Sequence, residues 1–275
     1  MSYRNHPFSL FLRIIVYASA AITVFILTSL IGYILIKGVP NLSLDLFAWK
    51  YTSDNVSMMP AIINTLIMTV VALLMAVPVG IFSAIYLVEY AKRGNKLVNV
   101  IRLTTETLAG IPSIVYGLFG YLMFVVALQW GYSLLAGALT LAIMILPLII
   151  RTTEEALKSV PDTYREGSFG LGAGKLRTVF KIVLPSAIPG ILAGVILGIG
   201  RIVGETAALI YTAGTVTGVA TDFFASGRTL SVHMYALLSE GLYMQEAYAT
   251  AVVLLIMVIV INGISSLIAK RFAKG

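Results

Sequence analysis

The sequence contains no cysteine and only 2 histidines, His6 and His233, among its 275 residues. The lack of cysteine excludes a disulfide framework, a thiolate metal site and a cysteine nucleophile. Two histidines so far apart in the chain also argue against a histidine-based metal cluster. We therefore expect that this chain binds no metal, and we find no nucleophile–base pair that would indicate an enzyme.

Charged residues are also scarce, at 11% of the chain against 59% hydrophobic residues. A soluble domain usually contains about 25% charged residues. The mean hydropathy of +0.97 is too high for a water-soluble fold of this length, because such a fold lacks the interior to bury so much apolar surface. The composition therefore argues against a soluble globular enzyme and predicts a protein that lies in a lipid bilayer.

Six apolar runs are long enough to cross the hydrocarbon core of a bilayer, which takes about 20 residues. The predicted spans are residues 14–36, 62–86, 108–128, 132–150, 187–210 and 248–269. The first run is too long for the core of a secretory signal, and no small-residue cleavage site follows it. Because no soluble domain interrupts the spans, we predict one all-α transmembrane domain over residues 1–275.

Basic residues are distributed unevenly between the segments that join these spans. Of the 19 Lys and Arg residues, only Lys37, Lys50 and Arg228 lie on one side, Arg201 lies within a span, and the others lie on the opposite side. Cytoplasmic loops carry an excess of Lys and Arg, so the asymmetry predicts that both termini are cytoplasmic. Topology accounts for most of the net charge of +7, and we expect no nucleic acid as a partner.

The longest segment on the predicted outer side, residues 211–247, contains apolar residues at helical spacing in its second half. One interpretation is a helix that lies on the membrane surface. The other is a docking surface or an outer gate.

The predicted cytoplasmic segment 151–186 is long and charged, and it is interrupted by Pro161 and by Gly170, Gly172 and Gly174. A chain this apolar has no need of such a segment unless a partner binds there. The run 170–175 superficially resembles a phosphate-binding loop, but Lys175 is followed by Leu176, where that motif requires Ser or Thr. We therefore expect no nucleotide site on this chain.

The same segment contains a motif of a glutamate, small residues and a Leu-Pro pair. It consists of Glu166, Gly167, Ser168, Gly172, Leu184 and Pro185. The pattern resembles the EAA loop of ABC-transporter permeases, although Gly167 and Ser168 stand where that family has two alanines. In that family the loop forms a coupling helix in a groove of a separate ATPase subunit, and Gly172 would let the chain turn. The alternative is an ordinary amphipathic inner loop.

Residues 84–90, 106–117 and 201–207 look like the phosphate-transport permeases of the PstA/PstC pair, and the length is closer to the PstA type. The resemblance implies a MetI-like ABC permease with six transmembrane helices in a bacterial inner membrane. It also implies a second, PstC-like permease subunit, two PstB-like ATPase subunits that bind ATP and magnesium, and an extracytoplasmic PstS-like phosphate-binding protein. The chain itself would bind no cofactor.

The fifth predicted span carries a stripe of glycines and charges. Its members are Gly190, Gly194, Gly198, Arg201 and Glu205. At about 100° per residue they fall within an arc of roughly 80°. Since glycines at this spacing let helices approach closely in lipid, the stripe is predicted to face protein.

Arg201 lies within this apolar span, where an arginine costs roughly 2.5–3.5 kcal/mol on insertion scales. One hypothesis is that Glu205, four residues on, neutralises it in a structural ion pair. The other is that Arg201 presents its forked guanidinium to phosphate, and that Glu205 positions the guanidinium or weakens phosphate binding. Ser113 and Tyr116 lie near a helix break expected at Pro112, and we expect that they reach the same path.

The sequence therefore predicts a permease subunit of an ATP-driven phosphate importer. Two alternatives stay open: a permease for another oxyanion, and a gradient-driven carrier or channel without ATPase subunits. The first differs only in the transported anion, whereas the second would make the EAA-like loop unnecessary.

Overall fold

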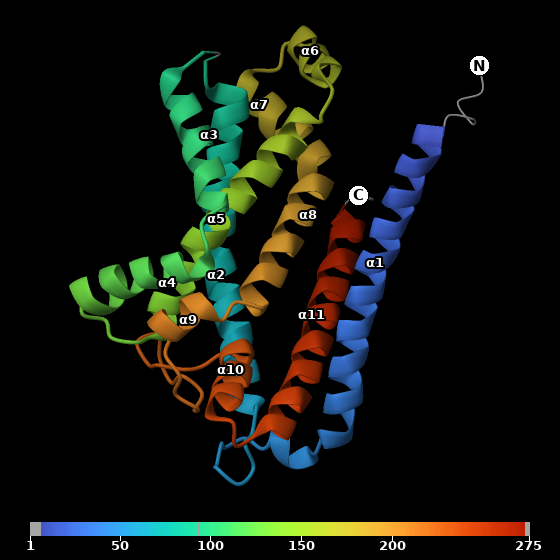
Figure 1. Cartoon of the computed structure of the whole chain (residues 1–275). Coiled ribbons are helices and arrows are strands. Elements are labelled where there is room, and N and C mark those ends of the chain that lie inside the picture. Colours follow the sequence, from blue (N-terminus) through green and yellow to red (C-terminus); the bar gives the residue numbers. More distant parts are fainter. Residues whose placement is uncertain (1–6, 93, 273–275) are drawn as a thin grey trace.

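The computed structural model describes residues 7–92 and 94–272, and every regular element within them is helical (Figure 1). This confirms the predicted all-α class. Arg4, His6, Arg93 and Lys274, which entered the arguments from charge and histidine content, lie outside the described residues. The α-helices are α1 (Pro7–Gly38), α2 (Met59–Ile85), α3 (Lys96–Ala109), α4 (Ser113–Gly120), α5 (Leu134–Lys158), α6 (Asp162–Gly170), α7 (Lys175–Thr178), α8 (Leu184–Val203), α9 (Ala207–Thr212), α10 (Leu230–Glu240) and α11 (Met244–Phe272).

Short 3₁₀ and π-helical turns complete the helical elements. Two 3₁₀ turns, Val39–Asn41 and Leu44–Phe47, follow α1. π-Helical turns at Tyr86–Tyr90 and Tyr121–Ala127 extend α2 and α4, and a third at Val179–Val183 joins α7 to α8. Each π turn widens the local backbone while keeping the helix continuous.

Within the described residues, five helical segments are long and apolar enough to cross a membrane, and the bent pair α3–α4 makes a sixth if it counts as one span. The predicted spans 14–36 and 248–269 lie inside α1 and α11. The predicted span 62–86 corresponds to α2 and the start of its π turn. These three predictions depended on hydropathy alone, which suffices where a long apolar run is uninterrupted.

The third predicted span, 108–128, is not one straight helix. α3 ends at Ala109, α4 begins at Ser113, and the two helices are bent by 105° at the break. Pro112 lies immediately before α4, where its missing N–H and fixed φ suit a helix start and not a helix interior. α4 consequently lies across the bundle (Figure 1). The helix break expected at Pro112 is found there, but the 105° bend was not predicted, because hydropathy measures an apolar run and not its direction.

The fourth and fifth spans also differ from their predicted bounds. α5 continues to Lys158, so the start of the predicted loop 151–186 is the end of a span. The helix that begins at Lys175 passes through its π turn into α8, which places Leu184 and Pro185 in a helix. α8 stops at Val203, well before the predicted end at residue 210.

α5 is the central helix of the bundle and packs against α2 and α8. The main core contains fully buried residues of α2 and α5 and the end of α8, among them Met68, Leu141, Ile145, Ile149 and Ile202. The glycine stripe lies at the α5–α8 contact. A Cβ at Gly190 would lie 2.7 Å from the Ala156 side chain, and one at Gly194 would collide with Thr152. The prediction that the stripe faces protein is confirmed for its glycines, whereas Glu205 lies beyond the end of α8.

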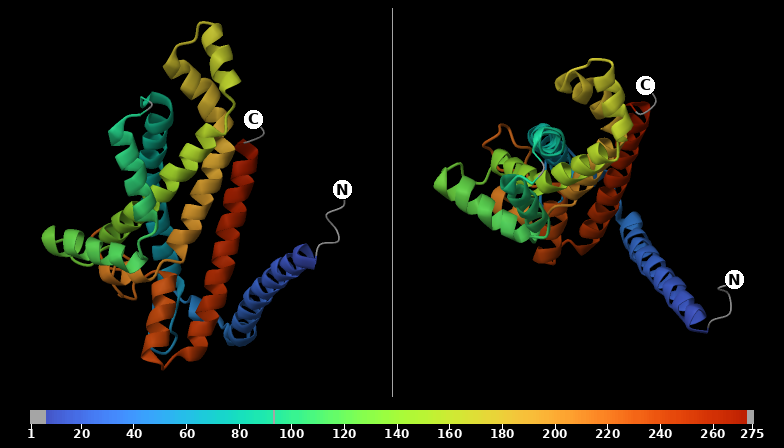
Figure 2. Two further views of the ribbon diagram at one scale, coloured as in Figure 1. Left: turned by 45° about the horizontal axis from the view of Figure 1, so that its top comes forward. Right: turned by 90° about the horizontal axis from the view of Figure 1, so that it is seen from above.

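α1 lies beside α11 at the edge of the bundle and projects away from the remaining helices (Figure 2). Nearly all of its described side chains are exposed. The described end of α1 near the N-terminus, the end of α11 near the C-terminus, and α6 lie at the same end of the molecule (Figure 1). We call this the α6 end and the opposite one the α10 end.

Candidate functional site

Arg201 lies in the last turn of α8, and its side chain is half-buried. Among the described residues it forms no ion pair. Glu205 does not continue the helical face, because α8 ends at Val203. The Glu205 carboxylate instead accepts a hydrogen bond from the backbone N–H of Ala208 at 3.0 Å. The predicted structural ion pair is therefore not formed, since the helix that would align the two residues is broken.

Glu205 is buried, with 8% of its surface exposed, and it joins three elements. Its carboxylate holds the first turn of α9, while its backbone oxygen accepts a hydrogen bond from the Ser231 hydroxyl of α10 at 2.5 Å. The break between α8 and α9 is thus fixed by polar contacts, and Arg201 lies immediately before it with no acidic partner among the described residues.

Tyr116 is buried in α4, and its hydroxyl donates a hydrogen bond to the backbone oxygen of Leu108 at 2.9 Å across the α3–α4 break. The Arg201 guanidinium is close enough to act electrostatically on this hydroxyl. Arg201 thus lies within electrostatic range of Tyr116, but no hydrogen bond in the described part of the chain joins the two. Ser113 begins α4 with a half-buried side chain, and no hydrogen bond in the described part of the chain links it to Arg201 or Glu205.

Gly117 explains how α4 approaches this break so closely. A Cβ at this position would lie 2.7 Å from the Cα of Ala208 in α9, which is too close for any side chain. α4 and α9 are short helices that follow breaks in the chain, and they pack directly against each other (Figure 1). Sequence reasoning missed Gly117 as a site residue. The signal was a glycine one position after Tyr116.

The EAA-like residues divide into an exposed group and an anchoring group. Glu166 and Gly167 lie exposed on α6, and nothing lies within 4 Å of a Cβ placed on Gly167. Gly172 has φ +82°, a conformation that glycine adopts at no cost, and it turns the chain after α6.

In the anchoring group, the Ser168 hydroxyl lies 2.8 Å from that of Thr178 and ties α6 to α7. Leu184 packs on the apolar cluster beneath, and Pro185 occupies the first turn of α8. The small residues on the outer face of α6 are therefore not required by packing within this chain.

The tip beyond α6 exposes apolar side chains around a hollow. Leu171 is 91% exposed, Leu176 66% and Tyr164 52%. A cavity of about 530 Å³ is lined by Tyr164, Ser168, Leu171, Gly172 and Arg177, among others. An exposed apolar patch next to a hollow is typical of a surface that binds another protein.

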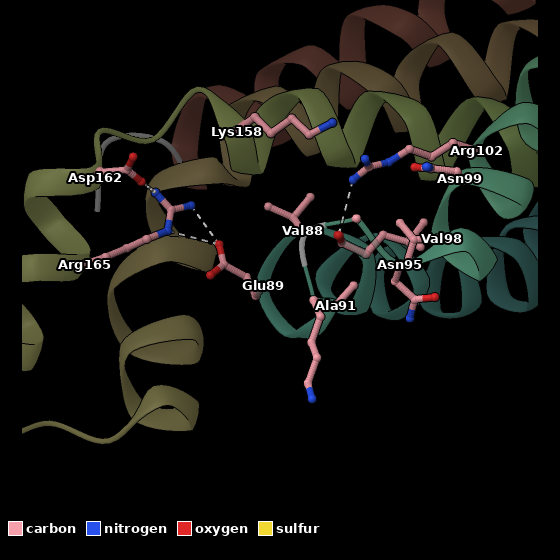
Figure 3. Close-up of a pocket in the computed structure, with 13 residues that line it drawn as sticks. Val88, Glu89, Ala91, Asn95, Val98, Asn99, Arg102, Lys158, Asp162 and Arg165 are labelled. Atoms are coloured by element: carbon pink, nitrogen blue, oxygen red, sulfur yellow. Dashed lines mark hydrogen bonds and ion pairs between the residues drawn. The ribbon is translucent and has the colours of Figure 1, made fainter.

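Behind α6, a second cavity of about 460 Å³ lies among the ends of α2, α3 and α5 (Figure 3). Arg165 of α6 reaches Glu89 at the end of α2 with a closest N–O distance of 2.7 Å, and it lies between that residue and Asp162. Nearby, Glu154 of α5 pairs with Arg102 of α3 at 2.7 Å and with Lys158 at 3.3 Å.

These ion pairs tie α6 to α2, and α3 to α5, at the α6 end of the bundle. The side chains of Arg165 and Glu89 are only 15% and 8% exposed, so solvent screens their attraction weakly. Sequence reasoning missed this network. The available signal was the presence of acids, Glu89 and Glu154, within strongly basic predicted inner segments.

The model of the family "Binding-protein-dependent transport system inner membrane component" matches residues 76–275. The chain belongs to this family. Among family relatives, the probable ABC transporter permease protein YqgI of Bacillus subtilis (strain 168) is 36% identical over 261 residues, with 88% of each chain covered. The phosphate transport system permease protein PstA 1 of Mycobacterium tuberculosis (strain CDC 1551 / Oshkosh) is 38% identical over 205 residues, covering 74% of this chain and 67% of that one.

Solved ABC importers have the same fold as this family member. A chain of a bacterial transporter that imports the acidic polysaccharide alginate superposes with a TM-score of 0.68 at 16% identity, covering 95% of each chain. A chain of the inward-facing MetNI methionine transporter gives 0.60 at 19% identity, covering 87% of this chain and 96% of that one. These likenesses confirm the predicted MetI-like ABC permease fold. Membership in the inner-membrane family, together with the apolar helices, confirms a multi-pass membrane protein.

Proposed function

We propose that this chain is the membrane-spanning permease subunit of an ATP-driven importer for inorganic phosphate. Membership in the permease family and the identity with PstA relatives support the transporter class and the anion. The single observation that carries the proposal is Arg201, a half-buried cation without an acidic partner at a break between two helices.

Arg201 acts as the anion-binding group of the path. An arginine suits a tetrahedral oxyanion because its planar fork donates two parallel hydrogen bonds. The Glu205 carboxylate accepts a hydrogen bond from the first turn of α9. It therefore does not pair with the Arg201 guanidinium, which remains available to phosphate. Tyr116 brings a hydroxyl near the same position, and Ser113 adds a second hydroxyl when the α3–α4 break opens.

The importer contains further subunits. A second, PstC-like permease completes the path, two PstB-like ATPase subunits bind ATP and magnesium, and an extracytoplasmic PstS-like protein delivers phosphate. This chain is not an enzyme and binds no cofactor. It lies in a bacterial inner membrane with both termini cytoplasmic, an orientation supported by the basic residues gathered at the α6 end.

The coupling surface is the exposed tip of α6. Glu166, Gly167 and Gly172 enter a groove of an ATPase subunit, while Ser168, Leu184 and Pro185 hold the tip on α8. When ATP closes the ATPases, the Arg165–Glu89 pair passes the movement of α6 to α2. The bundle then rocks between inward-open and outward-open states, and phosphate passes Arg201.

Uptake of labelled phosphate into vesicles that contain the assembled importer tests this function. We expect Arg201→Gln to assemble and to hydrolyse ATP, but to lose phosphate uptake by at least about tenfold, the effect of roughly one lost charge-assisted hydrogen bond. Lys50→Gln, which removes an exposed cation, serves as the matched control and keeps uptake. Unchanged uptake in Arg201→Gln would remove this residue from the path.

A further inference from the structure

Arg228, at the α10 end, is a second buried arginine whose backbone is held on both sides. It ends the segment between α9 and α10, and only 4% of its surface is exposed. Its backbone N–H donates to the carbonyl of Val216 at 2.9 Å, and its carbonyl accepts a hydrogen bond from Asn64 of α2 at 3.2 Å. The position of this side chain is therefore fixed by the fold.

The guanidinium of Arg228 has a neighbour on its face but none on one edge. Its central carbon lies 4.8 Å from the centroid of the Tyr51 ring, so the flat face stacks on an aromatic surface. Its Nε and Nη2 atoms are buried without any hydrogen-bond partner, and the described residues contain no ion pair to it. These two nitrogens form the edge that grips an oxyanion with two parallel hydrogen bonds.

His233 packs against the same Tyr51 ring as Arg228 and lies within electrostatic range of its charge. It is fully buried in α10, its ring meets that of Tyr51 edge-on at 6.2 Å, and neither of its ring nitrogens has a hydrogen-bond partner. Burial and the charge of Arg228 lower the pKa of His233 to about 3. The imidazole is therefore neutral at physiological pH and offers one donor and one acceptor.

A buried charge without a counter-charge, together with buried polar atoms that lack hydrogen-bond partners, is unfavourable. A ligand removes this cost if it supplies both the opposite charge and the missing hydrogen bonds. We propose that Arg228 and His233, with Tyr51 as the stacking platform, form a second anion site that binds a protonated tetrahedral oxyanion. A side chain of another subunit is a poorer occupant, because the cluster is enclosed by this chain alone. A small anion enters when the segment between α9 and α10 moves.

The position of the cluster suits a stage before Arg201. Ser231, three residues after Arg228, donates its hydroxyl to the backbone of Glu205 at the α8–α9 break. The two arginines therefore lie on neighbouring elements that share a hydrogen bond. This inference rests on the proposed function for the identity of the anion and for the direction in which it travels.

Neutral His233 also gives the site a reason to prefer phosphate. Phosphate keeps at least one proton at neutral pH, so it both accepts from Arg228 and donates to the free imidazole nitrogen. Sulfate carries no proton and leaves that acceptor unsatisfied. A site that hydrogen-bonds a donor rejects an analogue without one, because its own buried group stays unpaired.

The midpoint of thermal unfolding of the full chain in detergent tests the site. Phosphate is added to a buffer whose only other anion is bulky gluconate. We expect saturating phosphate to raise the midpoint by about 5 °C in the wild type, and sulfate to raise it less. Arg228→Gln loses the phosphate shift, whereas Lys50→Gln retains it. The proposal is overturned if Arg228→Gln keeps the full phosphate-induced shift of the midpoint, or if Lys50→Gln loses the shift to the same extent. If sulfate raises the midpoint as much as phosphate does, the role of His233 is overturned.

Arg228→Met guards against a variant that merely misfolds. If Arg228 is unpaired without an anion, Arg228→Met keeps the wild-type midpoint in gluconate and loses only the phosphate shift. If the midpoint of Arg228→Met falls equally with and without phosphate, the guanidinium has a structural role and the proposed anion site is contradicted. Failure of the proposed function looks different: full uptake in Arg201→Gln removes Arg201 from the path, while a phosphate shift that depends on Arg228 still establishes this site.

Discussion

Arg165, whose side chain is 15% exposed, and the buried Arg228 lie at opposite ends of the bundle, and the Nε–Nη2 edges of their guanidinium groups have different surroundings. At the α6 end, Nε and Nη2 of Arg165 both donate to Glu89, at 3.2 and 2.7 Å. At the α10 end, the same two atoms of Arg228 have no partner. An arginine that only joins helices, such as Arg165, pairs with an acidic residue of the same chain. Among the described residues, no acidic side chain pairs with the Nε–Nη2 edge of Arg228.

The acids near the α10 end do not fill the gap. Asp222 accepts a hydrogen bond from the backbone N–H of Phe224 at 2.7 Å and so stabilises a turn. Glu240 is exposed at the end of α10 and acts on Arg228 only at a distance. Burial accordingly lowers the pKa of Arg228, and Glu240 and Tyr51 oppose that shift. The two ends differ in whether a carboxylate contacts the guanidinium, and not in the kind of cation.

The largest expected effect comes from making Arg165 resemble Arg228. Glu89→Gln removes the buried carboxylate and leaves Arg165, whose side chain is 15% exposed, with the 81% exposed Asp162 as its acidic partner. We expect a loss of about 3 kcal/mol in the free energy of unfolding. The measurement is thermal or denaturant unfolding of the assembled importer. Glu155→Gln is the matched control, because the Arg151–Glu155 pair is 60% and 64% exposed and contributes under about 0.5 kcal/mol.

Adding Arg165→Met to Glu89→Gln tests the reason for that loss. If the cost arises from the stranded guanidinium, the double variant recovers much of the stability and phosphate stabilises only the single variant. Equal losses in Glu89→Gln and Glu155→Gln would instead mean that burial does not distinguish the two pairs. The contrast between the ends of the bundle would then have no energetic basis.

A pH titration gives the next largest effect, at the α10 end. The pKa of His233 is about 3 in the folded chain and 6.5 in the unfolded chain. Between these values the unfolded chain binds a proton that the folded chain does not, so stability falls as pH falls below 6.5. The slope is about 1.4 kcal/mol per pH unit, or about 2 kcal/mol at pH 5.

His233→Phe removes this proton while keeping an edge-on ring beside Tyr51. We expect its unfolding midpoint to depend less on pH than that of the wild type between pH 6.5 and 5, with other titrations common to both. Parallel pH profiles of the two proteins would show that His233 is protonated in the folded state, and would contradict its description as a neutral, enclosed imidazole.

The sequence predicted the long elements better than the site. Uninterrupted apolar runs located α1, α2 and α11, and the EAA-like motif located α6. Pro112 lies inside an apolar run, so hydropathy alone could not reveal a bend there. Arg201 and Glu205 are four residues apart, which suggested a pair, but the helix ends between them.

Arg228 was less accessible to sequence reasoning, which counted it only as one of three outer cations. Its importance depends on burial and on the absence of a partner, and both follow from how the segment between α9 and α10 folds onto Asn64 and Tyr51. The helical spacing after Leu230 was recognised, but as a surface helix or an outer gate. α10 instead buries Leu230, His233 and other side chains, and packs against α11 and α2.

The smallest expected effect comes from making Arg228 resemble Arg165. His233→Glu places a carboxylate beside the unpartnered edge and supplies the counter-charge that Glu89 provides at the other end. We expect the apparent affinity for phosphate in the unfolding assay to fall about tenfold, or about 1.4 kcal/mol, because the anion must now compete with an internal carboxylate. His233→Gln, which adds no charge, is the control and weakens phosphate binding less. If His233→Glu and His233→Gln weaken phosphate binding equally, His233 contributes only hydrogen bonds. The lack of an acidic partner would then not be the reason why the Arg228 edge binds an anion.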